Sequence, residues 1–246
     1  MELEGATALI SGGAKGLGLG IANYLHKGGA KVLVADLDSN ALAKLPRDIE
    51  GYLLDVTKPE DVKNLIRELT ITYGQIDILV NNAGVIYSEP MVNIMNSPKI
   101  MHDYDRFREC IRINLDSVFI MTSAIVEQMV IKRSKGVIVN ISSISACGNE
   151  GQVSYSAAKA GVNAMTVTLS KELGKLGIRC NAVAPGFIDT DSTRQALNES
   201  IINHIQSNTP LRRLGNIENV AQAVVSLIIN DFMNGVVLDV NGGLTI

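Results

Sequence analysis

The amino-acid sequence predicts an α/β protein, a doubly wound sheet of about seven parallel strands flanked by helices. Short β-rich segments alternate with longer helical patterns throughout the 246 residues, an order that places a parallel sheet between helix layers, with right-handed crossovers. The short segments are nearly continuous apolar runs, as expected for strands covered on both faces. No linker, repeat or charge block divides the chain, so we expect a single domain over residues 1–246.

Each expected strand is rich in Val, Ile, Leu and Ala. In chain order they read A-T-A-L-I-S, K-V-L-V-A-D, G-Y-L-L-D-V, I-D-I-L-V, G-V-I-V-N-I-S, I-R-C-N-A-V-A and V-V-L-D-V. Their expected positions are 6–11, 31–36, 51–56, 76–80, 136–142, 178–184 and 236–240.

Helical patterns fill the intervals between these strands. One of them has a clear start, because Thr57 precedes Lys58-Pro59 and proline is tolerated in a first turn. The helices are expected at 16–28, 38–45, 58–73, 104–133, 153–175 and 216–230. Two stretches, 85–103 and 186–215, interrupt the alternation. They are either surface loops or ligand-binding segments, since both follow carboxyl ends of strands.

Composition argues against several classes of protein. The 22 basic and 25 acidic residues give a net charge of −3 without a polybasic stretch, so neither nucleic acid nor an anionic membrane is an expected partner. Three scattered cysteines and three histidines without an H-x-x-x-H pair predict neither a disulfide framework nor a metal site. The start M-E-L-E-G resembles no targeting peptide, and no apolar run approaches the ~20 residues of a membrane span. We therefore expect a soluble, cytoplasmic protein.

A glycine-rich turn, S-G-G-A-K-G-L-G, follows the first strand. Its Gly12, Gly16 and Gly18 allow a sharp turn close to a pyrophosphate, and the following helix directs free N–H groups and a positive dipole end at it. The G-x-x-x-G-x-G spacing differs from the common G-x-G-x-x-G dinucleotide pattern. Close packing of strand and helix is the alternative explanation for these glycines.

Asp36 at the end of the second strand favours NAD over NADP. It lies near the ~20-residue offset at which an acidic residue accepts hydrogen bonds from the adenosine ribose, and it would repel a 2′-phosphate. Lys15 in the glycine turn is a counter-signal, because a cation there could pair with that phosphate. Asp36 could also be an ordinary polar residue at a strand end.

Y-S-A-A-K at 155–159 places Tyr155 and Lys159 on one helix face, and Ser142 ends the strand before that helix. Hydride transfer to a ketone leaves an alkoxide that needs a proton. A phenol with a pKa of ~10 is a poor base at neutral pH, but a nearby Lys⁺ and a positive nicotinamide ring would lower that pKa. Tyr155 is therefore the expected acid and base, although Tyr–Lys pairs at this spacing are common on helices.

Together these motifs resemble the short-chain dehydrogenase/reductase family over nearly the whole chain. The family pattern T-G-x-x-x-G-x-G corresponds to residues 11–18, with Ser11 in place of threonine. Asp55 corresponds to the acidic residue that contacts adenine, and N-N-A-G stands at 81–84. A-P-G-F-I-D-T at 184–190 is similar to the segment that flanks the nicotinamide.

The resemblance implies a Rossmann fold and NAD(P)-dependent interconversion of a secondary alcohol and a ketone. It implies four catalytic residues: Asn114, Ser142, Tyr155 and Lys159. Asn114 would connect the lysine to solvent through its backbone carbonyl and a water. The implied cofactor-binding residues are Gly12, Lys15, Gly16, Leu17, Gly18, Asp36, Asp55, Val56, Asn82, Ala83, Gly84, Tyr155, Lys159, Pro185, Gly186, Ile188 and Thr190.

Two groups within the family are similar to this chain. P-L-R-R-L-G and the closing V-N-G-G-L resemble 3-oxoacyl-[acyl-carrier-protein] reductases, which typically use NADPH. The long interval between Asn82 and Asn114 and the short N-D-F-M-N-G segment resemble NAD-dependent type-2 3-hydroxyacyl-CoA dehydrogenases. Both groups act on the β-oxygen of an acyl thioester. The methionines of 85–103 would either line an acyl channel or serve as flexible packing.

Three other expectations stay open at this point. The substrate could be a sugar, a polyol or a steroid, and the chain could also be a catalytically silent nucleotide-sensing module. The family resemblance further implies a homotetramer, with the helices 104–133 and 153–175 packing across a twofold axis.

Overall fold

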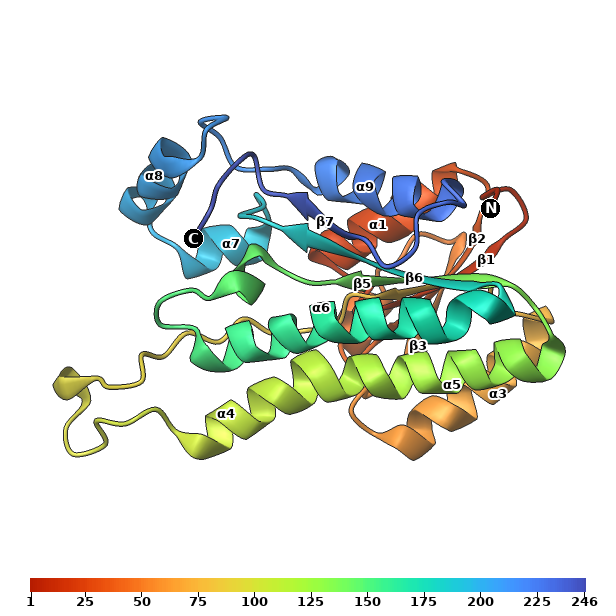
Figure 1. The fold of residues 1–246 in the computed structure, drawn as a ribbon, viewed down its shortest axis with the longest axis horizontal. Helices are drawn as coiled ribbons and strands as arrows, with labels where there is room; N and C mark the ends of the chain where they lie inside the picture. Colours follow the sequence, from red (N-terminus) through yellow and green to blue (C-terminus); the bar gives the residue numbers. More distant parts are fainter.

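The computed structural model describes the backbone of residues 1–246 and all side chains except those of Ser192 and Ala196. Seven parallel strands form a sheet in the order β3-β2-β1-β4-β5-β6-β7 (Figure 1). The predicted fold class is thereby confirmed. The strands are β1 (Thr7–Ser11), β2 (Lys31–Asp36), β3 (Ile49–Leu53), β4 (Ile78–Asn81), β5 (Gly136–Ile141), β6 (Ile178–Pro185) and β7 (Val237–Val240).

Helices cover both faces of this sheet. In chain order they are α1 (Gly16–Lys27), α2 (Ser39–Leu42), α3 (Pro59–Tyr73), α4 (Tyr104–Ile111), α5 (Ser117–Lys132), α6 (Val153–Leu173), α7 (Asp191–Ala196), α8 (Glu199–Asn208) and α9 (Ile217–Ile229). Three short 3-10 segments are η1 (Ile94–Asn96), η3 (Ile144–Cys147) and η4 (Gly174–Leu176), and a π-helical turn, η2 (Arg112–Asp116), joins α4 to α5.

Successive side chains of a strand pack alternately into two separate hydrophobic cores, one on each face of the sheet. On β1, Ile10 packs in the core that includes the buried faces of α1 and α9. The preceding Leu9 packs in the other core, with α3 and α5. Figure 1 shows α1 and α9 on one side of the sheet and α3, α5 and α6 on the other. Burial on both faces explains why the five inner strands are nearly continuous apolar runs.

The strand order reverses between β1 and β4, which are neighbours in the sheet although β2, β3 and their helices separate them in sequence. In open α/β sheets the carboxyl ends of strands at such a reversal form a crevice. Figure 1 shows α7, α8 and the 85–103 segment at this same end of the sheet. The fold therefore gathers at one edge the segments that follow β1, β4, β5 and β6.

Element boundaries differ from expectation where apolar residues continue beyond a strand. The third strand runs from Ile49 to Leu53 instead of 51–56, because its pairing with β2 ends at the Asp36–Leu53 register. The next apolar residues, Leu54 and Val56, are buried in the loop and mimic a longer strand in the sequence.

The expected helix 104–133 contains a π-turn, and α7 and α8 inside 186–215 were not predicted. Both missed helices have side-chain N-caps, supplied by Thr190 and Asn198. These helices are short, with six residues in α7 and ten in α8, so an apolar pattern has little length over which to repeat.

The helical run Tyr104–Lys132 is long and apolar enough to cross a membrane by length and composition, which we did not expect from the sequence. Part of this apolar surface serves the protein core. Met121, Ile125 and Met129 are buried with residues of α3 and of the sheet.

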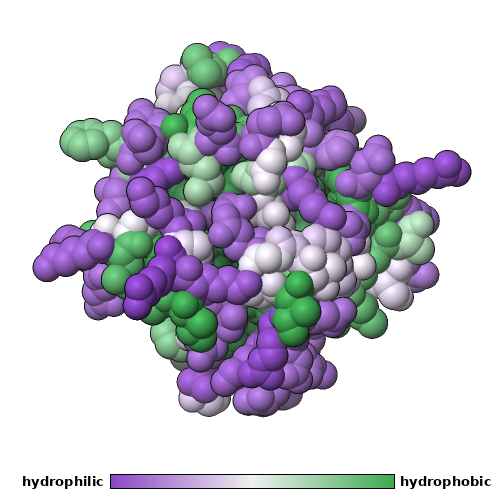
Figure 2. Space-filling view, turned by 90° about the vertical axis from the view of Figure 1, so that its right-hand side faces the viewer, coloured by the Kyte–Doolittle hydropathy of each residue, from purple (hydrophilic) through white to green (hydrophobic). Residues whose placement is uncertain are grey.

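Residues 85–103 form an extended arm that leaves the sheet after β4 and projects beyond the body of the protein (Figure 1). Met91, Met95 and Met101 are 60%, 90% and 51% exposed. Residues of this arm line a cavity of about 280 Å³. Of the three methionines, Met101 lines this cavity. The opposite end of the molecule is largely hydrophilic, with small separate apolar clusters (Figure 2).

Candidate active site

The glycine turn lies between the end of β1 and the start of α1. Gly12 and Gly16 have φ values of +63° and +54°, which favour glycine. A Cβ on Gly18 would lie 2.1 Å from the carbonyl oxygen of Gly12, and one on Gly12 would lie 2.8 Å from the Cα of Ala83. Close packing therefore accounts for Gly12 and Gly18, which is the alternative explanation given for the glycine turn. A Cβ on Gly16 would meet open space, so this glycine marks the accessible side of the turn.

The start of α1 fits a phosphate group. Its N-cap residue, Lys15, makes no side-chain cap hydrogen bond, and the first turn has no acidic residue. The helix N-terminus therefore keeps N–H groups and a positive dipole end for an anion. Asn82 holds the turn from the β4 side, because its Nδ2 donates to the Gly12 carbonyl at 2.7 Å and to that of Ser11 at 3.2 Å.

Asp36 ends β2 beside this turn and is 8% exposed. One carboxylate oxygen accepts the Ala14 N–H and the other the Asp38 N–H, both at 3.0 Å. Because each carboxylate oxygen has two lone pairs, both can still accept a hydrogen bond from a hydroxyl. Lys15 forms an ion pair with Asp38 at 2.8 Å. This pair raises the pKa of Lys15 and lowers that of Asp38.

Asp55 and Val56 follow β3 at the same edge of the sheet. The Asp55 Oδ1 accepts hydrogen bonds from the backbone N–H of Thr57 at 3.0 Å and from its hydroxyl at 2.6 Å. The bond from the hydroxyl is the main cause that lowers the pKa of Asp55. The carboxylate is therefore ionised at neutral pH. Sequence reading assigned Thr57 only to a helix start and missed this contact.

Ser142, Tyr155 and Lys159 lie close together behind the carboxyl end of β5. All three are at most 8% exposed. The Lys159 Nζ donates to the Ile141 carbonyl at 2.8 Å and lies 5.6 Å from the centre of the Tyr155 ring. The Ser142 hydroxyl donates to the Lys159 carbonyl at 3.4 Å. Strand end and helix thus bring a hydroxyl, a phenol and an amine into one place.

Burial sets the protonation of this pair in the protein alone. It raises the pKa of Tyr155 to about 12, although a hydrogen bond with Ser143 acts in the opposite direction. It lowers the pKa of Lys159 to about 8. We expect Lys159 and the positive nicotinamide ring together to lower the pKa of Tyr155; in the protein alone, desolvation of the phenol is the main cause and raises that pKa.

Asn114 occupies the middle of the π-turn and is fully buried. Its side chain donates to the carbonyls of Val85 and Cys110, both at 3.0 Å, and accepts the Val85 N–H at 3.2 Å. A Cβ on Gly84 would lie 2.7 Å from the Asn114 Oδ1 and 3.7 Å from the Lys159 Nζ. Gly84 therefore permits the close approach of both side chains.

The segment after β6 contains the remaining expected cofactor contacts. Pro185 ends the strand, Gly186 donates to the Val240 carbonyl at 3.0 Å, and Ile188 is 7% exposed. The Thr190 hydroxyl accepts the Thr193 N–H at 3.2 Å and caps α7. The carboxylate of the neighbouring Asp189 pairs with Arg194 at 2.5 Å.

Sequence reading missed a polar network around Gln152, the residue that precedes α6. The Gln152 side chain accepts from the Ser145 hydroxyl at 2.9 Å and from Asn149 at 3.0 Å, and it donates to Ser88 at 3.0 Å. It links the loop after β5 to the arm, where Glu89 donates its N–H to the Gly151 carbonyl at 2.7 Å. The signal in the sequence was the position of Gln152, three residues before Tyr155.

Comparison with known proteins agrees with this geometry. Residues 12–245 match the family described as Enoyl-(Acyl carrier protein) reductase. The chain is 38% identical to 3-oxoacyl-[acyl-carrier-protein] reductase FabG of Thermotoga maritima, with 100% of both chains covered. It is 36% identical to the protein of that name from Vibrio cholerae and 34% identical to that from Escherichia coli, each with 99% of both chains covered.

The fold has a similar solved relative. The structure titled "Crystal structure of gox2181" superposes with a TM-score of 0.90 at 31% sequence identity, covering 98% of this chain and 97% of the other. Together with the full-length relatives, this likeness extends from the glycine turn to the last strand. The chain is therefore an oxidoreductase that belongs to the short-chain dehydrogenase/reductase family.

Proposed function

We propose that the chain interconverts a secondary alcohol and a ketone with NAD, acting on a 3-oxoacyl or 3-hydroxyacyl thioester. One observation carries the proposal. Ser142, Tyr155 and Lys159 are buried together at the edge of the sheet that also holds the glycine turn. The relatives named 3-oxoacyl-[acyl-carrier-protein] reductase support the thioester as substrate, with acyl carrier protein as one of its carriers.

Each of the buried groups has a distinct task in this proposal. Bound nicotinamide nucleotide supplies or accepts the hydride. Tyr155, whose pKa is about 12, is protonated at neutral pH and can donate its proton to the alkoxide formed from a ketone. Lys159, with a pKa of about 8, is mainly cationic at pH 7 and stabilises the phenolate that remains. The sequence assigns the substrate oxygen to Ser142, but that hydroxyl donates to the Lys159 carbonyl, so the adjacent Ser143, which hydrogen-bonds Tyr155, is better placed to orient the substrate. Asn114 supports proton transfer from solvent.

The residues described above fit a dinucleotide at four places. We propose that Gly12, Lys15, Gly16, Leu17 and Gly18 contact the pyrophosphate side, with Asp36 on the adenosine ribose. Asp55 and Val56 would contact adenine. Asn82, Ala83, Gly84, Pro185, Gly186, Ile188 and Thr190 would surround the nicotinamide half together with Tyr155 and Lys159.

A substrate panel read by nicotinamide absorbance tests the proposal. We expect acetoacetyl-CoA and 3-oxoacyl groups on acyl carrier protein to consume NADH, and sugars, polyols and steroids to be much poorer substrates. Turnover confined to a polyol or a steroid would support that branch of the family instead. Binding of NADH without turnover of any alcohol or ketone would support a nucleotide-sensing module.

We expect NADH to bind at least about tenfold more tightly than NADPH, which corresponds to about 1.4 kcal/mol. Asp36 would oppose a 2′-phosphate, and Asp38 neutralises the one nearby cation of the turn, Lys15. Asp36→Ala should narrow the preference. Asp38→Asn should also narrow it by releasing Lys15, and adding Lys15→Met to that variant should restore it. Titration of cofactor fluorescence measures all four proteins, and tighter binding of NADPH by the original chain would contradict this prediction.

We also propose that residues 1–246 act as one domain and assemble as a homotetramer. Three side chains of α5 support this assembly: Phe119, Val130 and Ile131 are 61%, 45% and 68% exposed. Covering these apolar side chains would remove them from water. A light-scattering mass of a single chain would contradict the assembly.

A further inference from the structure

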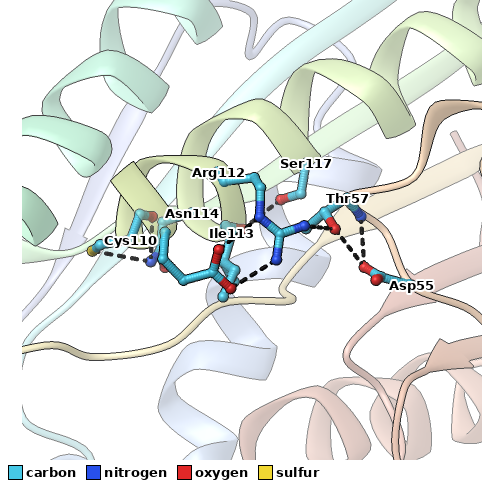
Figure 3. A network of polar contacts seen from close by, with 8 residues as sticks. Asp55, Thr57, Cys110, Arg112, Ile113, Asn114 and Ser117 are labelled. Carbon is cyan, nitrogen blue, oxygen red and sulfur yellow. Dashed lines mark hydrogen bonds and ion pairs between the residues drawn. The ribbon is translucent and has the colours of Figure 1, made fainter. Parts of the chain in front are cut away.

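A chain of polar contacts joins the loop after β3 to the π-turn that carries Asn114 (Figure 3). Arg112, the first residue of the turn, donates from Nη1 to the hydroxyl oxygen of Thr57. That hydroxyl donates onward to the Asp55 Oδ1 at 2.6 Å. Two segments that are 55 positions apart in sequence are thereby connected by side chains.

The charges along this chain alternate. The Arg112 Nε and Nη2 each donate to one carboxylate oxygen of Glu109 at 2.7 Å, which fixes the plane of the guanidinium. Arg112 also contributes to the lowered pKa of Asp55, after the hydrogen bonds from Thr57 and the charge of Lys58. An anion, a cation, a hydroxyl and a second anion therefore follow one another.

The Thr57 hydroxyl is oriented by two partners, because it donates to Asp55 and accepts from Arg112. A hydroxyl has one hydrogen to donate, and in Thr57 it points to Asp55. Arg112 can only donate, so it occupies a lone pair of the Thr57 hydroxyl oxygen. This contact disfavours other side-chain rotamers of Thr57. The Asp55 Oδ1 receives both the hydroxyl and the backbone N–H of Thr57, and among the described residues no group donates to Oδ2. Oδ2 is therefore the oxygen available to an outside donor.

Stability alone is a weak explanation for this arrangement. The side chains of Arg112 and Glu109 are 44% and 50% exposed. Ion pairs at such exposure contribute little to folding, about 0–1 kcal/mol.

We propose that Arg112 is a positioning residue for the adenine end of the dinucleotide. By holding the Thr57 hydroxyl, it aims the Asp55 Oδ2 at the 6-amino group of adenine. This inference rests on the proposed dinucleotide site. It adds a residue that touches neither substrate nor cofactor and that lies on the same turn as Asn114.

Equilibrium binding of two cofactors tests this role without requiring turnover. The probes are NADH and reduced nicotinamide hypoxanthine dinucleotide, in which an oxygen replaces the 6-amino group. We expect Arg112→Met to weaken NADH binding about fivefold, which is less than the loss of a whole hydrogen bond to a charged group, because the Asp55 carboxylate itself remains. Its binding of the hypoxanthine analogue should stay within about twofold of the original chain, because that analogue has no amino group to donate.

Matched variants separate positioning from a general loss of structure. Arg108→Met removes an exposed arginine from α4 and should leave both affinities unchanged. Thr57→Val should weaken NADH binding as Arg112→Met does, and Thr57→Ser should preserve it. The double variant Arg112→Met/Thr57→Val should be no weaker than Thr57→Val alone, since both act through one chain of contacts.

Other outcomes overturn the inference. If Arg112→Met weakens both cofactors equally, the residue has only a structural role. If it changes neither affinity, the contacts do not position adenine. Failure of the original chain to bind NADH would overturn the proposed function and this inference together, whereas normal NADH binding with no effect of Arg112→Met would overturn the inference alone.

Discussion

Tyr155→Phe should lower turnover by about a thousandfold while leaving NADH affinity within about threefold of the original chain, given the 10²–10⁴-fold effects of general acid–base groups. The substitution removes the phenolic proton and keeps the ring that is buried beside Lys159. Single-turnover reduction of a 3-oxoacyl thioester measures the chemical step, and cofactor fluorescence measures binding.

Tyr24→Phe is the matched control for this experiment. Tyr24 lies on α1, where it packs on the core that contains that helix, away from Ser142 and Lys159. Its loss of a hydroxyl should change turnover less than twofold. If Tyr155→Phe keeps a substantial fraction of the original rate, the phenol is not the proton donor and another group must be found.

Lys159→Met should reduce turnover by about a hundredfold or more, which is the lower end of what an acid–base assembly contributes. It should also shift the pH dependence of alcohol oxidation upward. Oxidation needs the Tyr155 phenolate, and removal of the lysine cation makes that phenolate harder to form. The midpoint of the oxidation rate against pH should therefore rise, while reduction, which uses the phenol, should keep its pH dependence at neutral pH.

Stability measurements distinguish this effect from unfolding. Burial lowers the pKa of Lys159 from 10.5 to about 8, so the unfolded chain binds more protons between these values. The cationic lysine thus costs stability at pH values below about 8, and this cost disappears as the pH rises from about 8 to 10.5. Lys159→Met should lack this rise in stability with pH. A variant that loses activity because it is unfolded at neutral pH would contradict this explanation.

The fold could be predicted from sequence because burial on both faces makes the five inner strands nearly continuous apolar runs. The same signal misplaced the third strand, where Leu54 and Val56 are apolar but lie beyond the pairing. Helices α7 and α8 were missed because they are short, six and ten residues, and follow one another within a segment that was read as irregular.

The candidate site was partly predictable for a different reason. Ser142, Tyr155 and Lys159 are fixed by a strand end and a helix period, both of which a sequence displays. The balance of desolvation and charge at Tyr155 depends on three-dimensional burial, so the direction of its pKa shift could not be read from spacing. The contact of Arg112 with Thr57 depends on a long side chain reaching another segment, and no local pattern predicts it.

Titration of Tyr155 with and without NAD is the most direct test of the proposed chemistry. Labelling tyrosine at Cζ allows its ionisation to be followed by NMR, with Tyr155→Phe identifying the resonance. We expect a pKa of about 12 in the protein alone and a value several units lower with NAD bound, because the positive nicotinamide ring adds to the charge of Lys159. A phenol that stays near 12 when NAD is bound would contradict the account.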